Sequence, residues 1–335
     1  MMLTVTLYTR SNCSLCDEVK RDLDALQGQY PHRLVEVDIE SDSSLFQEYR
    51  FEIPVVEVGP YRLKAPISKQ ELVIALGAAQ DRLTQLNRLG DEKHRARLRR
   101  GRSITWADRF SFWLSRHYLA LINLLMFIYV GLPFLAPVLM KSGATAPANL
   151  IYTAYSPLCH QLSFRSWFLF GQQAYYPRAA AGIEGVQTFD QAIGVEDNGE
   201  ASFFLQARRF RGNETLGYKV ALCERDVAIY GAMLLFGLLY ALTGRRLRPL
   251  HAALWLLAGW VPIGLDGFSQ LFSQMNIPLL TTILPYREST PFLRTLTGFL
   301  FGFTTAWFAY PYLEETMRET RQILLKKFAA VQTAG

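Results

Sequence analysis

The sequence predicts an α/β domain in residues 1–80, followed by an all-α membrane domain of about four transmembrane helices plus a re-entrant segment. Three observations lead to this prediction. Strand and helix patterns alternate over the first part, long apolar runs fill the second, and basic residues gather between the two. Half of the 335 residues are apolar and 19% are charged, so the uneven distribution of the apolar residues is informative. A chain of this length typically forms two domains.

The first part alternates strands and helices. Three runs rich in β-branched residues, 3–10, 33–40 and 53–58, predict strands, and residues 61–65 are a candidate fourth. The segments after the first, second and last of these have the apolar spacing of helices. The order strand–helix–strand–helix–strand–strand–helix is that of a compact α/β domain.

Cys13 and Cys16 form a Cys-Ser-Leu-Cys motif between the first strand and the first helix. The free N–H groups and the macrodipole of a helix N-terminus favour a thiolate, which lowers the pKa of the first cysteine. The second cysteine, one turn later, can attack a mixed disulfide and release the partner. The motif therefore predicts a redox pair. Half of a zinc site is the alternative, although no second pair of ligands lies in this part of the sequence.

YTRSNCSLCDEVKRDL, followed by EIPVVEV, resembles the glutaredoxin-like branch of the thioredoxin superfamily over residues 1–80. The resemblance implies a thioredoxin-like fold, thiol–disulfide exchange, Cys13 as the nucleophile and Cys16 as the resolving thiol. It also implies a cis peptide bond between Ile53 and Pro54 that faces the cysteines, where the Ile53 backbone can pair with an extended substrate.

Two departures from ordinary glutaredoxins concern the partner. Ser14 stands where those proteins have proline, and VGPYRLKAPISKQEL lacks the paired glycines and aspartate that hold glutathione. We therefore expect a protein or small-molecule thiol or disulfide as partner, without assigning glutathione.

Four apolar runs predict an integral membrane protein: 117–140, 227–244, 250–265 and 295–313. With its flanks, each run approaches the ~20 residues that a helix needs to cross the hydrocarbon core. The N-terminal sequence MMLTVTLYTR lacks the basic and apolar regions of a secretory signal, so the first part is expected to stay in the cytoplasm.

Residues 81–116 contain ten Lys or Arg and four Asp or Glu, a net charge of +6 that equals the formal charge of the whole chain. Such a run before a span indicates a cytoplasmic side, and contact with anionic lipid headgroups is compatible with it. A charge run alone does not predict nucleic-acid binding, and we expect no nucleic-acid partner.

The turn after the second run and the chain's tail are also basic, so both are expected on the cytoplasmic side. Four spans satisfy these constraints and place both termini in the cytoplasm, with the chain in the inner membrane of a bacterium. Residues 150–171 then enter the outer face as a re-entrant or interfacial helix pair broken near Pro157. The predicted parts are residues 1–80, a basic amphipathic linker helix at 81–116, the membrane domain at 117–313 with an external loop at 172–219, and a cytoplasmic tail helix at 314–335.

Polar residues occur within otherwise apolar sequence in the re-entrant segment and at the outer ends of the second, third and fourth spans. At a rise of about 1.5 Å per residue they fall at one depth near the outer surface. Ionisable residues inside a membrane cost several kcal/mol unless they are paired, so one buried site is predicted. Its members are Cys159, His160, Gln161, Arg165, Ser166, Cys223, Arg225, Asp266, Gln270, Arg294 and Thr297.

CHQLSFRS, CERDVAIYG, DGFSQ and LRTLTG, in that order, resemble the DUF2085 family of small bacterial membrane proteins over about residues 150–310. That family's pattern has C-x-R-C-T-G where this chain has Cys223-Glu224-Arg225-Asp226. Residues 172–216 look like an insertion. The resemblance implies no reaction.

Three functional interpretations of the polar site remain open. Cys159 and Cys223 are a disulfide or an exchanging thiol pair, coupled to the first domain through a lipid quinone or a moving element. Alternatively, Cys159, His160, Cys223 and Asp266 bind a metal such as zinc. The third interpretation is an anion clamp for a lipid phosphate or a small solute, formed by Arg165, Arg225 and Arg294.

A purely structural network of Arg–Asp pairs and a disulfide is the fourth possibility. We favour a membrane-tethered thiol–disulfide oxidoreductase with an outward-facing Cys/His/Asp/Arg site. The alternative is a metal-dependent protein that binds or transports a lipid headgroup or small solute and is regulated by the redox domain.

Overall fold

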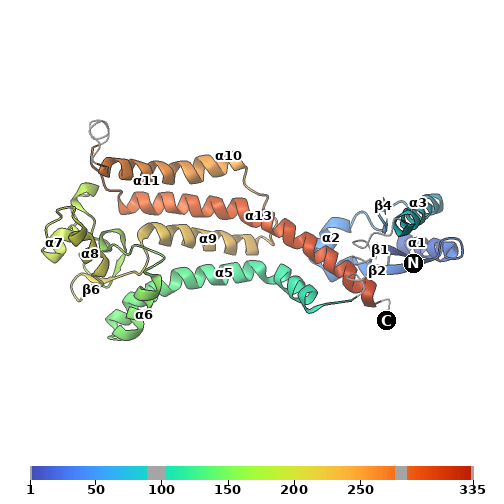
Figure 1. The fold of residues 1–335 in the computed structure, drawn as a ribbon, viewed down its shortest axis with the longest axis horizontal. Helices are drawn as coiled ribbons and strands as arrows, with labels where there is room; N and C mark the ends of the chain where they lie inside the picture. Colours follow the sequence, from blue (N-terminus) through green and yellow to red (C-terminus); the bar gives the residue numbers. More distant parts are fainter. Residues whose placement is uncertain (1, 89–102, 276–284, 333–335) are drawn as a thin grey trace. The chain divides into compact units, whose positions relative to one another are not determined.

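The computed structural model describes residues 2–88, 103–275 and 285–332, and its ribbon is drawn in Figure 1. The chain divides into two compact units. The first comprises Met1–His117 with Glu315–Gly335, and the second is Tyr118–Glu314. Part of the predicted linker helix, residues 89–102, lies outside the described residues.

The first unit contains a four-stranded sheet of order β2-β1-β3-β4, in which β1 and β2 are parallel and the other pairs antiparallel. Its elements follow the predicted order, which confirms the α/β domain. They are β1 (Leu3–Thr9), α1 (Ser14–Leu26), β2 (His32–Asp38), a 3-10 turn η1 (Ile39–Ser41), α2 (Ser43–Tyr49), β3 (Val55–Val58), β4 (Tyr61–Lys64) and α3 (Lys69–Arg88).

Alternation along β1 sends side chains into a separate core on each face of the sheet. Val5 and Leu7 are fully buried in one core with residues of α1 and α3. Tyr8 points to the other face, into a core that it shares with Tyr49 of α2. Helix α1, which begins at the cysteine motif, therefore packs on one face of the sheet, and α2 packs on the other.

The last helix, α13 (Pro291–Gln332), ends in the first unit. There Leu325 packs against the core of Tyr8 and Tyr49, and Lys326 pairs with Glu57 at 2.7 Å. The tail predicted as a helix at 314–335 is therefore the end of a longer helix rather than a separate element.

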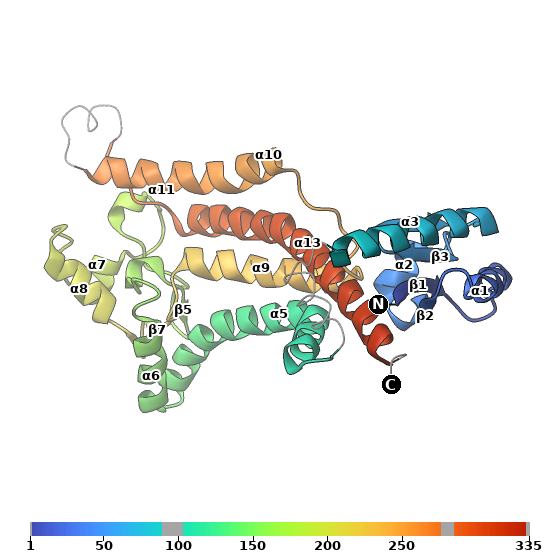
Figure 2. The same ribbon diagram turned by 45° about the vertical axis from the view of Figure 1, so that its right-hand side comes forward.

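The second unit is mostly helical, and among its described residues three helices are long and apolar enough to cross a membrane. They are α5 (Trp106–Lys141), α9 (Glu224–Leu242) and the continuous stretch Ala252–Gln274. That stretch is built from α10 (Ala252–Leu254), a π-helical segment η4 (Trp255–Trp260) and α11 (Val261–Gln274). Figures 1 and 2 show these helices running alongside the first half of α13.

The predicted fourth span, 295–313, is helical as part of α13 but is not among those three helices. Its threonine, glycine, tyrosine and tryptophan residues lower its mean hydropathy. A membrane domain with four transmembrane helices therefore stays a prediction.

Small residues let these helices approach closely, as is common between membrane helices. Gly298 and Gly302 of α13 lie against the backbone of Arg225 and Ile229 in α9, too close for any side chain at either glycine. Gly237 of α9 is equally close to the side chain of Asn123 in α5. These contacts fix α9 between its two neighbours.

The segment between α5 and α9 differs from the prediction of an external loop at 172–219. It contains α6 (Thr145–Tyr155), η2 (Ser163–Arg165), β5 (Phe168–Leu169), η3 (Ala179–Ala181), α7 (Phe189–Ile193), α8 (Ala201–Arg209), β6 (Gly212–Asn213) and β7 (Gly217–Lys219). Aromatic residues from several of these short elements, among them Phe164, Phe189 and Phe203, form one buried core. The elements are too short to show periodicity in the sequence, so only their packing reveals the fold.

The predicted re-entrant segment, 150–171, is α-helical only at its start. α6 ends at Tyr155, just before the predicted break at Pro157, and the chain continues as a loop and a 3-10 turn. Eleven residues of helix extend about 16 Å, roughly half of the hydrocarbon thickness. Entry of this segment into the membrane stays a prediction.

Candidate functional site

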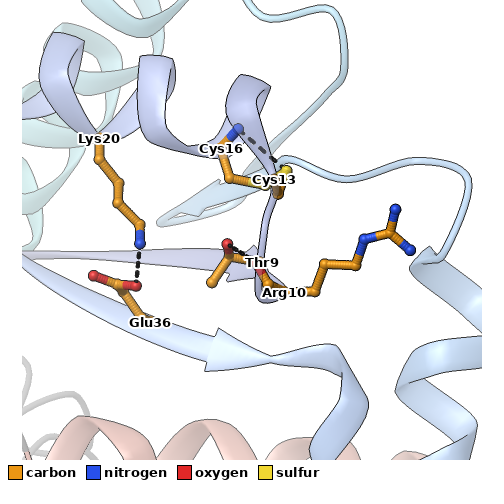
Figure 3. Close-up of a disulfide and its surroundings, with 6 residues drawn as sticks. All are labelled: Thr9, Arg10, Cys13, Cys16, Lys20 and Glu36. Carbon is orange, nitrogen blue, oxygen red and sulfur yellow. Dashed lines mark hydrogen bonds and ion pairs between the residues drawn. A yellow bond between two sulfur atoms is a disulfide. The ribbon is translucent and has the colours of Figure 1, made fainter.

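Cys13 and Cys16 form a disulfide at the start of α1 (Figure 3). Cys13 is the N-cap residue, and its carbonyl accepts the N–H groups of Cys16 and Asp17 at 3.0 and 3.1 Å. The Cys16 N–H also lies 3.2 Å from the Cys13 sulfur. Cys16 is fully buried while Cys13 is half-buried. An incoming sulfur can therefore reach Cys13 and not Cys16.

The Ile53–Pro54 peptide bond is cis, as the resemblance implied. Pro54 directly precedes β3, whose first residue, Val55, pairs with Tyr8 near the end of β1. The cysteine loop leaves β1 at that same end, so Pro54 and the disulfide both lie at the same end of the two central strands. A second cis bond, Ala65–Pro66, was not predicted, because an X-Pro pair in a sequence does not reveal its isomer.

Cys159, His160 and Cys223 form a second group, which we call the sulfur cluster. One potential ligand atom from each residue lies within 4.8 Å of the others. Both cysteines are buried and not disulfide-bonded, whereas His160 is exposed. Cys223 is the N-cap residue of α9: its N–H donates to the Cys159 sulfur at 3.3 Å, and its own sulfur accepts the N–H of Asp226 at 3.5 Å.

The two thiols of the sulfur cluster are not equivalent. A hydrogen bond with Cys223 lowers the pKa of Cys159, against the effect of burial and of the nearby Asp226 carboxylate. The same hydrogen bond, together with burial, raises the pKa of Cys223 well above its ordinary value.

Buried polar groups hold the loop that carries Cys159 and His160. Gln161 has a positive φ of 52°, and its side-chain amide donates to the Tyr152 carbonyl at 2.9 Å. Its carbonyl accepts from the ammonium of Lys219 at 2.7 Å, and Lys219 also donates to the Arg208 carbonyl at 2.7 Å. Burial lowers the pKa of Lys219 to about 7. The loop is thus fixed to both α6 and α8.

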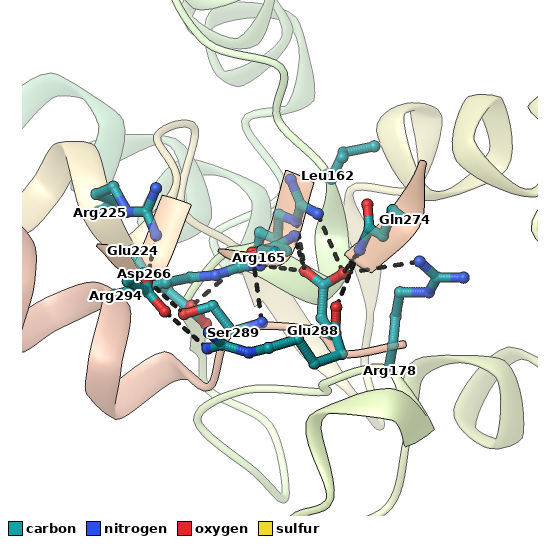
Figure 4. A network of polar contacts seen from close by, with 12 residues as sticks. Leu162, Arg165, Arg178, Glu224, Arg225, Asp266, Gln274, Glu288, Ser289 and Arg294 are labelled. Atoms are coloured by element: carbon teal, nitrogen blue, oxygen red, sulfur yellow. Dashed lines mark hydrogen bonds and ion pairs between the residues drawn. The ribbon is translucent and has the colours of Figure 1, made fainter. Parts of the chain in front are cut away.

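A third group, the charge network, is centred on two buried carboxylates, Glu288 and Asp266 (Figure 4). Arg165 donates twice to Glu288, at 2.8 and 3.1 Å, and Arg294 also binds it. Burial alone would raise the pKa of Glu288, but the surrounding arginines hold it below its ordinary value. Glu288 also contacts Arg178, Gln270 and Gln274.

Asp266 binds the side chains of Arg225 at 2.5 Å, Arg287 at 2.9 Å and Ser289 at 2.7 Å. Glu224 is as deeply buried as Glu288, and within the described chain neither of its carboxylate oxygens has a hydrogen bond. The nearest cation is Arg294, at 4.0 Å. All of these acids lie on α9, on α11 or just before α13.

The structure divides the predicted polar site in two. Five of its residues meet in the charge network: Arg165, Arg225, Asp266, Gln270 and Arg294. The sulfur cluster is separate. Ser166 and Thr297 donate to backbone carbonyls of Leu162 and Leu293, and no bond from either side chain to another predicted site residue occurs in the described ranges.

The structure changes two details of the predicted polar site. The three arginines of the proposed anion clamp, Arg165, Arg225 and Arg294, each face a carboxylate. Asp266, proposed as a metal ligand, is engaged by arginines, while Asp226 lies beside the sulfur cluster.

Sequence reasoning missed Glu288, Arg178, Arg287 and Lys219. Arg287 and Glu288 are adjacent charged residues a few positions before the apolar run 295–313, and this local feature could have marked them. Arg178 pairs with Asp197 at 2.6 Å, and both lie in the segment taken as a loop. Nothing local in the sequence marks Lys219 as a buried anchor.

Comparisons with known proteins agree with both resemblances. Residues 4–77 match the family model of the glutaredoxin-like domain (DUF836), and residues 208–308 match that of the DUF2085 predicted membrane proteins. The second match includes Cys223, Asp266 and Arg294 but begins after Cys159 and His160. The chain is also 23% identical over 208 residues to the uncharacterized protein MJ1492 of Methanocaldococcus jannaschii, which covers 60% of this chain and 96% of that protein. No solved structure matches the chain.

Proposed function

We propose that this chain is a membrane-tethered thiol–disulfide oxidoreductase that works through Cys13 and Cys16. The glutaredoxin-like domain joined to a predicted membrane domain fits a membrane-associated redox protein. The observation that carries the specific proposal is the disulfide at the first turn of α1, with one sulfur accessible and the other buried. This asymmetry separates an attacking thiol from a resolving one.

The exchange proceeds in two displacements. In the reduced protein, the Cys13 thiolate attacks one sulfur of a partner disulfide, forms a mixed disulfide and expels the other partner sulfur as a thiolate. Cys16, deprotonated, then attacks the Cys13 sulfur, forms the Cys13–Cys16 disulfide and expels the second partner thiolate. The protein loses two electrons and the partner gains them, so oxidised protein with a dithiol partner runs the same steps in reverse.

The helix N-terminus assists this chemistry. When the disulfide opens, the Cys16 N–H that lies 3.2 Å from the Cys13 sulfur is positioned to donate to the thiolate. The α1 macrodipole adds to this stabilisation, because Cys13 is the N-cap residue. We place this domain and both termini in the cytoplasm of a bacterium, four spans in its inner membrane, and the polar groups of the second unit toward the outer side.

Trapping the mixed disulfide tests the proposal. Full-length protein in detergent is reduced, exposed to a small aromatic disulfide and quenched with acid, and the adducts are read by mass spectrometry. Cys16→Ser should retain a stable adduct on Cys13, while the wild type should pass rapidly to the internal disulfide. The matched control, Cys223→Ser, should behave like the wild type. Absence of an adduct on Cys13 in the Cys16→Ser protein would overturn the assignment.

A second candidate function, binding of an anionic lipid headgroup or small solute by the second unit, is favoured by a polar cavity of about 420 Å³. Three arginines and no carboxylate line it, so it suits a negatively charged ligand better than a cation. Its residues are Tyr152, Thr153, Ser156, Gln161, Leu205, Arg208, Arg209 and Arg211.

Binding of the purified protein to vesicles with and without phosphatidic acid, and to inorganic phosphate, separates the two ligand sources. Arg209→Ala is the informative variant, because Arg208 and Arg211 also hold Ser156 and Asn149. Equal binding by Arg209→Ala and the wild type to every probe would contradict this candidate.

A further inference from the structure

We propose that the sulfur cluster is a zinc site in which Cys159, His160, Cys223 and Asp226 are the four ligands. The site is independent of exchange at Cys13 and Cys16. It replaces Asp266 of the sequence-based ligand set by Asp226, and it assigns Cys159 and Cys223 to metal binding instead of redox coupling.

The donor atoms are already close to the spacing that zinc requires. With Zn–S bonds of about 2.3 Å, two sulfurs of a tetrahedral site stand about 3.8 Å apart. One donor atom from each of Cys159, His160 and Cys223 lies within 4.8 Å of the others. Side-chain rotations and shifts of about 1 Å therefore suffice to bring these three donors onto one ion. Although Cys159 and His160 are adjacent in the sequence, each places a donor atom in this group.

Asp226 completes the set because it lies one helical turn after Cys223. Cys223 is the N-cap of α9, so the side chain of Asp226 in the first turn projects on the same side of the helix. The Asp226 N–H already donates to the Cys223 sulfur at 3.5 Å, and the Asp226 carboxylate, which lies outside the group formed by the other three donor atoms, would turn toward the ion when zinc binds. Asp266 is excluded geometrically, since Arg225, Arg287 and Ser289 occupy its two oxygens.

Backbone N–H groups also suit two thiolates at this position. The sulfur of Cys159 accepts the Cys223 N–H, and the sulfur of Cys223 accepts the Asp226 N–H. Such bonds outside the coordination sphere orient thiolates and spread their negative charge. His160 Nδ1 accepts the Leu162 N–H at 3.1 Å, so a neutral ring carries its proton on Nε2. Zinc binding at Nε2 would move that proton to Nδ1 and open the contact with Leu162, so the ring itself releases no proton and only the two thiols do.

Four protein ligands leave no open coordination position, which is the pattern of a structural site. The ion would join the loop after α6 to the start of α9, two segments that are 64 residues apart at Cys159 and Cys223. His160 is the exposed member of the cluster, so the ion would enter and leave past it.

Metal analysis of full-length protein in detergent tests the site. Cys13→Ser/Cys16→Ser is the background for all samples, so that no metal can bind at the first pair. We expect about one zinc ion per chain by elemental analysis, and after exchange with Co²⁺ a near-ultraviolet thiolate-to-cobalt charge-transfer band. The cobalt spectrum is measured on protein with an intact sulfur cluster. It therefore tests the site even if a variant of the cluster fails to fold.

Variants then identify the ligands. Cys223→Ser should lose the metal. Asp226→Asn should weaken zinc binding at least about tenfold, because even the loss of a residue that only hydrogen-bonds to a ligand lowers metal affinity by about that factor. Asp266→Asn is the matched control and should keep the metal. A cobalt spectrum without the thiolate band, or equal zinc in Cys223→Ser and the background protein, would overturn the site. Loss of zinc in Asp266→Asn but not in Asp226→Asn would overturn the fourth ligand.

Discussion

The two cysteine sites begin with the same local geometry and differ in what surrounds it. Cys13 and Cys223 are both N-cap residues, of α1 and α9, and each sulfur lies near the N–H group of the residue three positions later, at 3.2 and 3.5 Å. In the first unit that residue is Cys16, which closes a disulfide. In the second it is Asp226, and the partner sulfur comes from Cys159 on a distant segment.

The comparison teaches that a helix N-terminus prepares a thiolate without deciding its chemistry. In the first unit an accessible sulfur is paired with a buried one, which suits exchange with a partner. In the second, two buried sulfurs and an imidazole converge, with an aspartate one helical turn away, which suits an ion. The predictions below test whether the two sites differ as described.

The largest effect is expected from Cys13→Ser. Loss of the attacking sulfur should reduce the rate of thiol–disulfide exchange by at least about 10³-fold, as removal of a nucleophile generally does. The rate is measured with full-length protein and a chromogenic disulfide. Cys159→Ser, the matched change in the second unit, should leave the rate within a factor of two or so. A comparable loss in both variants would show that the two sites act as one.

Glu288→Gln should destabilise the second unit by about 3–5 kcal/mol, because it leaves buried arginines without their carboxylate. Thermal unfolding in detergent, followed by circular dichroism and by protection of the buried cysteines, measures the change. Exchange at Cys13 should persist in this variant. Unchanged protection of Cys159 and Cys223 would contradict the structural role of the charge network.

The pH dependence of stability should carry the signature of Glu288. Its pKa in the folded protein is below the ordinary value of 4.5, so the folded state binds fewer protons than the unfolded state near that pH. The stabilisation is therefore complete above about pH 4.5 and is lost as the pH falls through the lowered pKa. The acid side of the stability curve should be flatter in Glu288→Gln. Parallel curves for the two proteins would show that Glu288 does not titrate in this way.

Asp226→Cys gives α9 the Cys-x-x-Cys spacing of α1 and so makes the two helix starts alike. Thiolate is a better zinc ligand than carboxylate, so zinc affinity should stay equal or rise, by up to about tenfold. Competition with a chromogenic chelator measures it. Formation of a Cys223 disulfide in air at the expense of zinc would instead show that a second cysteine is enough to make a redox site here.

The smallest effect is expected at Thr297, which belonged to the predicted site but donates only to the Leu293 carbonyl within its own helix. Thr297→Val should change the free energy of unfolding by less than about 0.5 kcal/mol and leave zinc content unchanged. A change of several kcal/mol would mean that the charge network extends further along α13.

The first unit was predictable from sequence because each of its signals is local. Alternation in β1, the apolar spacing of α1 and the Cys13–Cys16 motif all lie within a few turns or strands of the chain. The second unit was predictable only in part. Apolar length revealed three of its helices, and the depth of polar residues along them indicated that Arg225, Asp266 and Arg294 would meet.

Which charged residues pair with one another in the second unit was not predictable, because the pairing depends on packing between segments that are distant in the sequence. Arg287 and Glu288 lie outside the apolar runs, and they decide the pairing: Arg287 binds Asp266, whereas Glu288 binds Arg165 and Arg294. Asp226 is local to Cys223, yet its role follows only once Cys159 is placed beside that helix start. The aromatic core around Phe164 arises from short elements that carry no periodic signal.

Differential thiol labelling of one full-length sample tests the central claim, that the two cysteine pairs carry different chemistry. The protein is alkylated with or without a reductant and with or without a zinc chelator, and labelling at each cysteine is quantified by mass spectrometry after digestion. Labelling of Cys13 and Cys16 should depend on the reductant alone, and labelling of Cys159 and Cys223 on the chelator alone. If Cys159 and Cys223 become reactive only with the reductant, they are a second disulfide and the distinction between the two sites fails.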